Sequence, residues 1–284
     1  MPCPLCDDSG WKPVERDGAR FVTRCECWRD TLATRLLTDA RLPRRYQHCS
    51  LDTFVTYGNE SLQRAVAAAK VVADKFPTVD RGLFLLGPPG VGKTHIAVAT
   101  LKAIVERKRI TALFYDTREL LRAIRQTYDA SEAATESTVL RPILGCDLLV
   151  LDDLGAEKST EWVEETLNLI VNHRYSERKT TMFTSNYDDK PDISDPDSLL
   201  CRIGYRMRSR LHEMCEFIHL DGADYRELPP NGDVDDLRMM WQQRRQQPMK
   251  TRALPSRANP ARAQLHSPDQ GDGQLKWTGG RAGT

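Results

Sequence analysis

One segment of this chain, residues 87–94, reads Gly-Pro-Pro-Gly-Val-Gly-Lys-Thr and directly follows the apolar run 83–86. Glycines in such a loop let several backbone N–H groups point at phosphate oxygens, and the helix that begins there adds its positive end. Lys93 is expected to reach the β- and γ-phosphates, and Thr94 to bind Mg²⁺. The sequence therefore predicts a nucleoside triphosphate site, which we assign to Gly87, Pro88, Pro89, Gly90, Val91, Gly92, Lys93, Thr94 and His95.

Two carboxylates, Asp152 and Asp153, end a second apolar run at residues 148–151. Carboxylates at the end of a buried strand are what a Mg²⁺ site beside a phosphate loop requires. We expect Asp152 to hold the metal through water together with Thr94, and Asp153 to orient and deprotonate the attacking water. Because Asp is one methylene shorter than the Glu often found in this role, we expect slow hydrolysis.

An amide, Asn186, follows closely on the expected strand 180–184. If the two strands are neighbours in one sheet, this amide can hydrogen-bond the γ-phosphate and the attacking water together. An Asn after a strand is otherwise a common turn residue, so its assignment depends on the order of the strands. We predict that Asn186 detects whether the γ-phosphate is present.

Arg202, Arg206 and Arg210 recur every four residues, so they are expected to share one face of a helix over residues 199–213. An ATPase that works as a ring or filament needs an arginine of the next subunit at the γ-phosphate. Arg210 is the first candidate for this role and Arg206 the second, while Arg226 would add a positive contact within the same subunit. The arginine face is equally suited to DNA phosphates, and the sequence leaves both readings open.

Four thiols close to the start of the chain have the spacing of a metal site: Cys3, Cys6, Cys25 and Cys27. Four thiolates suit tetrahedral Zn²⁺ and leave no open position, which predicts a structural metal. The segment is too small to fold on a core, so the metal would supply its folding energy. A short hairpin through Val14 and residues 21–23 would bring the pairs together. Free or redox-active thiols are the alternative.

The composition sets bounds on the whole chain. Its 284 residues, 40% of them hydrophobic, are enough for one α/β core with small additions. Lys and Arg number 41 against 40 Asp and Glu, so a nucleic-acid site must be a local patch. No apolar run approaches the roughly 20 residues of a membrane span, and the start lacks the features of a signal peptide. We therefore expect a cytoplasmic protein.

Apolar runs alternate with helical patterns through the middle of the chain, which predicts a mostly parallel five-stranded sheet with helices on both faces. The expected strands are 83–86, 111–115, 148–151, 180–184 and 217–220. The expected helices are 94–106, 118–128, 160–175 and 199–213, with a surface loop over 129–138. A further amphipathic helix is expected between residues 59 and 76.

These patterns divide the chain into four parts. We predict a zinc-binding module at 1–30, a linker helix and connection at 31–58, an ATPase domain at 59–230 and a disordered basic tail at 231–284. From residue 237 onward there are nine Lys or Arg and only two Asp, with few apolar residues. The tail could contact nucleic acid through its charge or serve only solubility.

Taken together, residues 87–94, 148–155, 184–186, 209–211 and 224–226 resemble the AAA+ ATPases of the bacterial and phage helicase-loader group, the DnaC and DnaI type. The resemblance covers about residues 43 to 228, and the cysteine module is similar to the zinc-bearing, helicase-binding region of some loaders. It implies ATP, Mg²⁺ and Zn²⁺ as cofactors and ATP-dependent self-assembly into a ring or filament. It also implies a hexameric replicative helicase, which the protein would load onto single-stranded DNA under the control of ATP.

Two other functions are compatible with the same residues. The ATPase core is shared with transposition helper ATPases of the IstB type, although these usually begin with a helical segment rather than a zinc module. A third possibility is a single-stranded DNA binding protein that scarcely hydrolyses ATP and uses it as an assembly switch.

Overall fold

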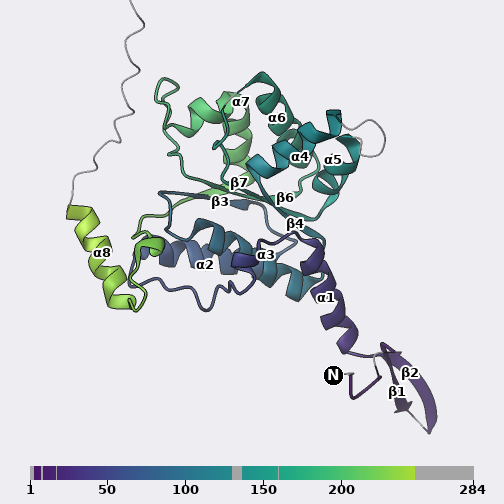
Figure 1. Cartoon of the computed structure of the whole chain (residues 1–284). Coiled ribbons are helices and arrows are strands. Elements are labelled where there is room, and N and C mark those ends of the chain that lie inside the picture. Colours follow the sequence, from purple (N-terminus) through teal and green to yellow (C-terminus); the bar gives the residue numbers. More distant parts are fainter. Residues whose placement is uncertain (1–2, 8, 17, 130–135, 159, 247–284) are drawn as a thin grey trace, which may run out of the picture. The chain divides into compact units, whose positions relative to one another are not determined.

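The computed structural model describes residues 3–7, 9–16, 18–129, 136–158 and 160–246 (Figure 1). Its centre is a five-stranded parallel sheet in the order β4-β5-β6-β3-β7. The strands are β3 (Gly82–Leu86), β4 (Ala112–Asp116), β5 (Leu148–Asp152), β6 (Thr180–Ser185) and β7 (Cys215–His219). The predicted fold class is confirmed. Among the described residues, no helix has the length and apolar character that crossing a membrane demands.

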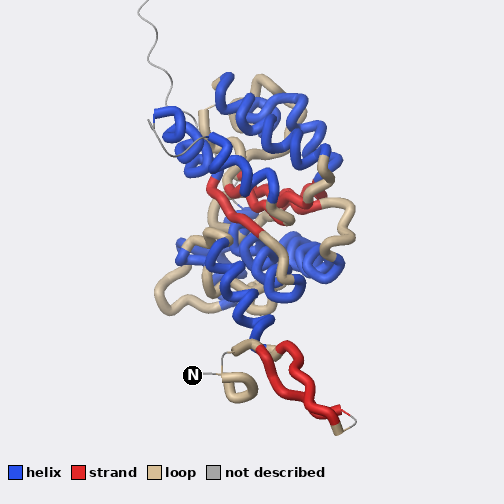
Figure 2. The backbone as a smooth tube through the Cα atoms, turned by 90° about the vertical axis from the view of Figure 1, so that its right-hand side faces the viewer, coloured by secondary structure: helices blue, strands red, loops and turns tan. Residues whose placement is uncertain are grey.

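Helices cover both faces of this sheet, as Figure 2 shows from the side. One face carries α2 (Glu60–Lys75) and α3 (Lys93–Lys108), and the other carries α4 (Thr117–Asp129), α5 (Glu136–Gly145), α6 (Glu161–Ser176) and α7 (Leu199–Met214). Successive strand residues point to opposite faces. Leu83 and Leu85 accordingly join the core under α2 and α3, whereas Phe84 and Leu86 join the core on the other side. Every residue of β3 is buried, which explains its unbroken apolar sequence.

The loop predicted over 129–138 is helical in part, because α5 begins at Glu136; residues 130–135 lie outside the described residues. The helix is short and contains Pro142, which weakens its pattern. Leu140 and Ile143, three residues apart, supply its buried side.

Gly204 interrupts α7 with a non-helical backbone (φ 75°, ψ 164°). The prediction that Arg202 shares one face with Arg206 and Arg210 is therefore wrong, since a regular helical repeat does not run through position 204. Instead, Arg202 donates to the carbonyl of Pro196 (3.0 Å), turning back along the chain that precedes α7. The four-residue spacing remains valid only for Arg206 and Arg210.

The disordered tail predicted from residue 231 begins too early, because α8 spans Val234–Gln246. Leu237 is buried in the core, and Met240 and Trp241 pack against it at helical spacing. The Trp241 indole donates to a carboxylate oxygen of Asp221 (3.3 Å), and Arg244 donates to the carbonyl of Gly222 (2.8 Å). Tertiary contacts therefore stabilise a helix whose composition alone suggests disorder. Residues 247–284 of the predicted tail lie outside the described residues.

The first part of the chain forms the predicted hairpin. Strands β1 (Trp11–Arg16) and β2 (Ala19–Arg24) pair antiparallel, with Trp11 opposite Arg24. Helix α1 (Cys27–Asp39) starts at the last cysteine rather than at residue 31. At its other end the Ala40 carbonyl accepts a hydrogen bond from the backbone N–H of Phe114 (2.9 Å), which attaches the end of the helix to β4.

Candidate functional site

The glycine-rich loop connects β3 to α3 and lies against the backbone that follows β7. A β-carbon at Gly87 would fall 2.1 Å from the carbonyl oxygen of Leu220, so only glycine fits this approach. Gly92 takes a left-handed conformation (φ 99°) directly before α3. The loop therefore ends at the N-terminus of α3, where free backbone N–H groups and the helix dipole favour binding of an anion.

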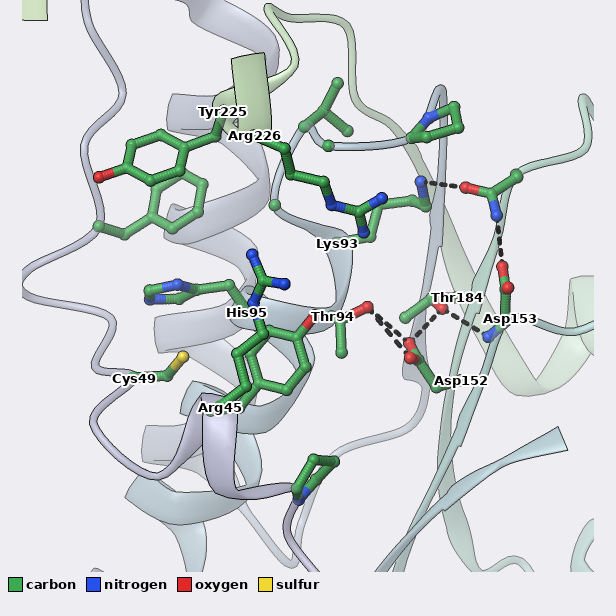
Figure 3. A pocket seen from close by; sticks show the side chains of 18 of the residues that line it. Arg45, Cys49, Lys93, Thr94, His95, Asp152, Asp153, Thr184, Tyr225 and Arg226 are labelled. Atoms are coloured by element: carbon green, nitrogen blue, oxygen red, sulfur yellow. Dashed lines mark hydrogen bonds between the residues drawn. The ribbon is translucent and has the colours of Figure 1, made fainter. Parts of the chain in front are cut away.

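Lys93 is buried at this point, and its ammonium is fixed by protein oxygens. It donates to the carbonyls of Gly87 and Pro88 (both 2.8 Å) and to the amide oxygen of Asn186 (2.7 Å). The amide nitrogen of Asn186 donates in turn to the carboxylate of Asp153. Burial lowers the pKa of Lys93 to about 8. A single hydrogen-bond chain thus joins the phosphate loop, the end of β6 and the residue after β5 (Figure 3).

Asp152 lies beside the first turn of α3. The Thr94 hydroxyl donates to its carboxylate (2.9 and 3.1 Å), as does the Thr184 hydroxyl (2.6 Å). Burial raises the pKa of Asp152 to about 6. A hydroxyl and a carboxylate in contact form an oxygen-only donor set, which fits the preference of Mg²⁺. A divalent cation here would also compensate the cost of burying the Asp152 charge.

Asp153 has a left-handed backbone (φ 60°), and its N–H donates to the Thr184 hydroxyl (2.9 Å). Among residues with a side chain, Asp and Asn enter this region at the lowest cost. The conformation gives a physical reason for Asp, rather than the longer Glu, at the position expected to act on water.

These groups line one side of a cavity of about 920 Å³. Figure 3 shows Arg226 entering it from η2 (Tyr225–Glu227), on the same side as Lys93. His95 also lines the cavity, with its ring edge-on to Phe54 (5.2 Å between centroids). Burial lowers the pKa of His95, so its ring is neutral near pH 7. The structure therefore brings all predicted residues of the phosphate loop, both acids, Asn186 and Arg226 to one place.

Arg206 and Arg210 do not reach this cavity within the described part of the same chain. Arg210 donates to the Arg206 carbonyl (3.2 Å) and lies 6.0 Å from the ring centre of Tyr175. Both arginines are at least partly exposed, on the part of α7 that follows Gly204. Their placement allows a contact with another molecule and shows none with the nucleotide site of their own chain.

The opposite wall of the cavity was not predicted. It is built by the connection between α1 and α2, which contributes Arg41, Pro43, Arg45, Tyr46, His48, Cys49, Thr53, Phe54, Val55 and Tyr57. No short motif marks these residues. They reach the site because Lys102 of α3 donates to the carbonyls of Gln47 and Cys49, contacts between positions more than 50 residues apart.

The four N-terminal cysteines come together, with all Sγ atoms within 4.8 Å of one another. Cys3 and Cys25 are 3.7 Å apart and Cys6 and Cys27 are 3.2 Å apart. A tetrahedral zinc with Zn–S bonds of about 2.3 Å separates its sulfurs by about 3.8 Å, close to these spacings. The hydrogen bond between Cys6 and Cys27 lowers the pKa of the Cys6 thiol to about 7 and raises the pKa of the Cys27 thiol. The donor set therefore fits a structural zinc.

Around this cluster, large apolar side chains face solvent. We call them the module surface: Leu5, Trp11, Phe21, Val22 and Trp28. All six residues of β2 are exposed, so the hairpin lacks a core of its own. The Arg24 guanidinium connects the hairpin to α1, since it lies 5.4 Å from the ring centre of Trp11 and 4.4 Å from that of Trp28.

We predict that the purified chain carries close to one zinc per molecule and that Cys25→Ser loses most of it, because three thiolates hold zinc much less tightly than four. Cys201→Ser, outside the cluster, is the matched control and should keep the metal. Metal analysis by mass spectrometry gives the readout. Hydrogen exchange that shows a protected hairpin in metal-free protein would contradict the prediction.

The parallel sheet with strand order β4-β5-β6-β3-β7, its glycine-rich loop after β3 and the acids after β5 define the chain as an AAA+ protein of the phosphate-loop class. The comparison with family models agrees over most of the sequence. The chain belongs to the family of IstB-like ATP binding proteins, whose model matches residues 19–227.

Several proteins are similar to this chain. The phage-like element PBSX protein XkdC of Bacillus subtilis (strain 168) is 25% identical over 235 residues, which cover 78% of this chain and 84% of XkdC. The replicative helicase loader DnaC of Buchnera aphidicola subsp. Acyrthosiphon pisum (strain APS) is 25% identical over 156 residues, 55% of this chain and 63% of the loader. The crystal structure of the DnaC helicase loader superposes with a TM-score of 0.56 and 36% identity, covering 63% of this chain and 99% of that one.

Proposed function

We propose that this protein loads a replicative helicase onto single-stranded DNA, and that ATP binding and hydrolysis control its hold on both. The observation that carries the proposal is a cysteine module with exposed apolar side chains, joined by α1 to a nucleotide site. An exposed apolar group of this kind favours docking to another protein. The likeness to proteins named as helicase loaders supports the identity of that partner.

The site residues support an ATPase cycle. Lys93 and the loop amides bind the phosphates, and Mg²⁺ held by Thr94 and Asp152 would neutralise charge on them. Asp153 accepts the proton of the attacking water, while Asn186 places that water against the γ-phosphate. Because Asp153 is held by the Asn186 amide, the same hydrogen bond sets both the position of the base and the response to the γ-phosphate.

Arg210 is proposed to complete the site from a neighbouring subunit, with Arg206 as second candidate. Arg210 is partly exposed on α7 and is not among the residues that line the cavity of its own chain, which supports an action in trans. An arginine supplied in this way stabilises the charge that develops at phosphoryl transfer. Turnover would then depend on assembly.

Transposition help of the IstB type is the second candidate, and the description of the family favours it. The cysteine module and the named loaders among the relatives weigh toward the loader. The two functions differ in partner more than in chemistry.

For the enzyme, we predict that Lys93→Ala abolishes ATP binding and turnover, because it removes the phosphate contact. Asp153→Asn should keep binding and lose roughly 100-fold or more in turnover, because the amide does not take a proton. Asp192→Asn, on an exposed loop, should behave as the parent. Phosphate release is measured with and without single-stranded DNA, beside nucleotide affinity. Equal ATP turnover in the parent and in Lys93→Ala would show that this site does not hydrolyse ATP.

The action of Arg210 in trans is tested by mixing two inactive chains. Arg210→Ala contributes an intact nucleotide site and Lys93→Ala contributes an intact arginine, so a mixture should regain part of the turnover that each lacks alone. Full turnover of Arg210→Ala by itself, under assembling conditions, would show that the assignment is wrong.

For the partner, we predict that a hexameric replicative helicase is captured by the immobilised full chain. The exposed positions Phe21 and Val22 belong to the module surface, and a Phe21→Ser, Val22→Ser variant should lose this capture. Leu169→Ser, an exposed apolar position on α6, is the matched control. Capture of a transposase without the helicase would favour the second candidate and contradict the loader.

A further inference from the structure

The wall of the cavity opposite the phosphate loop belongs to the segment that connects the cysteine module to the ATPase core. We call residues 40–49 the linker segment. Its first residue is attached to β4 through the hydrogen bond from Phe114 to Ala40 (2.9 Å). Its last residues are attached to α3, because Lys102 donates to the carbonyls of Gln47 and Cys49. A ligand in the cavity therefore lies between the ATPase core and the linker segment.

Arg45 lies on η1 (Arg44–Tyr46) in the middle of the linker segment. Figure 3 shows its side chain rising into the cavity beside His95, from the side opposite to the one from which Arg226 enters. Within the described residues, no carboxylate pairs with the Arg45 guanidinium. Arg41, by contrast, is already engaged, since it donates to the Tyr115 hydroxyl (2.9 Å) and stacks on that ring.

Lys93, Arg226 and Arg45 supply cations to the cavity. Carboxylates line it beside the phosphate loop and at the junction of β4 and α4: Asp152, Asp153, Asp116 and Glu119. An unpaired guanidinium in a cavity is a strong donor to phosphate oxygens, which it can bind with two parallel hydrogen bonds. Since Lys93 is expected at the β- and γ-phosphates, the α-phosphate, nearest the ribose, is left for a cation on the opposite wall of the cavity.

We propose that Arg45 binds the α-phosphate of the nucleotide and thereby couples nucleotide occupancy to the linker segment and to the cysteine module that it carries. The proposal rests on the nucleotide site proposed above. The contact between Arg45 and the α-phosphate would hold the linker segment against the ligand only while nucleotide is bound. By reciprocity, if nucleotide changes the affinity of a partner that binds through the linker segment, that partner changes the affinity for nucleotide by the same factor.

The first test compares nucleotide affinities of three full-length variants. Arg45→Ala should weaken ATP and ADP by about tenfold each, the loss of a charge-assisted phosphate contact, and by the same factor, because both nucleotides have an α-phosphate. Arg45→Lys should recover part of the loss. Arg44→Ala, the neighbouring arginine that does not line the cavity, should bind as the parent. The unfolding midpoint without nucleotide should be unchanged in all three.

Affinities of Arg45→Ala within twofold of the parent would overturn the proposal. Weakening of ATP alone would place Arg45 at the γ-phosphate and would overturn the α-phosphate assignment. These outcomes are distinct from a failure of the nucleotide site itself, in which the parent would bind neither nucleotide.

The second test measures the coupling. Hydrogen exchange of residues 40–49 and of α1 should slow when ADP saturates the parent and should not change in Arg45→Ala at a saturating ADP concentration. Arg44→Ala should respond as the parent. Equal protection in Arg45→Ala and the parent would overturn the coupling.

Discussion

The hydrogen-bond chain from Lys93 through Asn186 to Asp153 is the interaction on which the rest of the site depends. It requires three consecutive strands, because Lys93 follows β3, Asn186 follows β6 and Asp153 follows β5. In the order β5-β6-β3 the middle strand brings its amide between a cation on one side and a carboxylate on the other. Parallel strands end at the same edge of a sheet, so all three groups meet there. An order without β6 between β5 and β3 would add at least one further strand width, about 4.8 Å, between Asn186 and one of its two partners.

Under the proposed function, this arrangement would let the site distinguish ATP from ADP. The γ-phosphate would lie next to the Asn186 amide, which already links Lys93 and Asp153. A change in the hydrogen bonds of Asn186 would therefore affect both Lys93 and Asp153. The left-handed backbone at Asp153 keeps its carboxylate within hydrogen-bond distance of the Asn186 amide. On the far side of the cavity, the linker segment directly follows α1. It is held to β4 by a main-chain hydrogen bond and to α3 by the Lys102 side chain. The hairpin of the cysteine module lacks a core of its own, so a zinc ion held by the four cysteines would supply its folding energy.

Much of this site can be predicted from the sequence because its chemistry lies in short segments. In residues 87–94 the backbone and side chains of eight consecutive positions carry the phosphate contacts, and the acids after β5 and the cysteine pairs are similarly local. The rest depends on tertiary contacts. Helix α8 is predicted as tail because its composition is polar, yet Leu237 anchors it in the core. Gly204 interrupts the helix between Arg202 and Arg206, so the four-residue spacing of arginines that is regular in the sequence is not regular in the structure. Arg45 enters the cavity only because distant hydrogen bonds place the linker segment there.

The central claim is that the Asn186 amide converts the presence of a γ-phosphate into a change in partner binding. The most direct measurement is the affinity of the full chain for a hexameric replicative helicase, with ATP and with ADP, in the parent and in Asn186→Ala. The account predicts different helicase affinities in the two nucleotides for the parent. It predicts equal affinities for Asn186→Ala, although that variant still binds both nucleotides. Equal helicase affinity with ATP and ADP in the parent would contradict it.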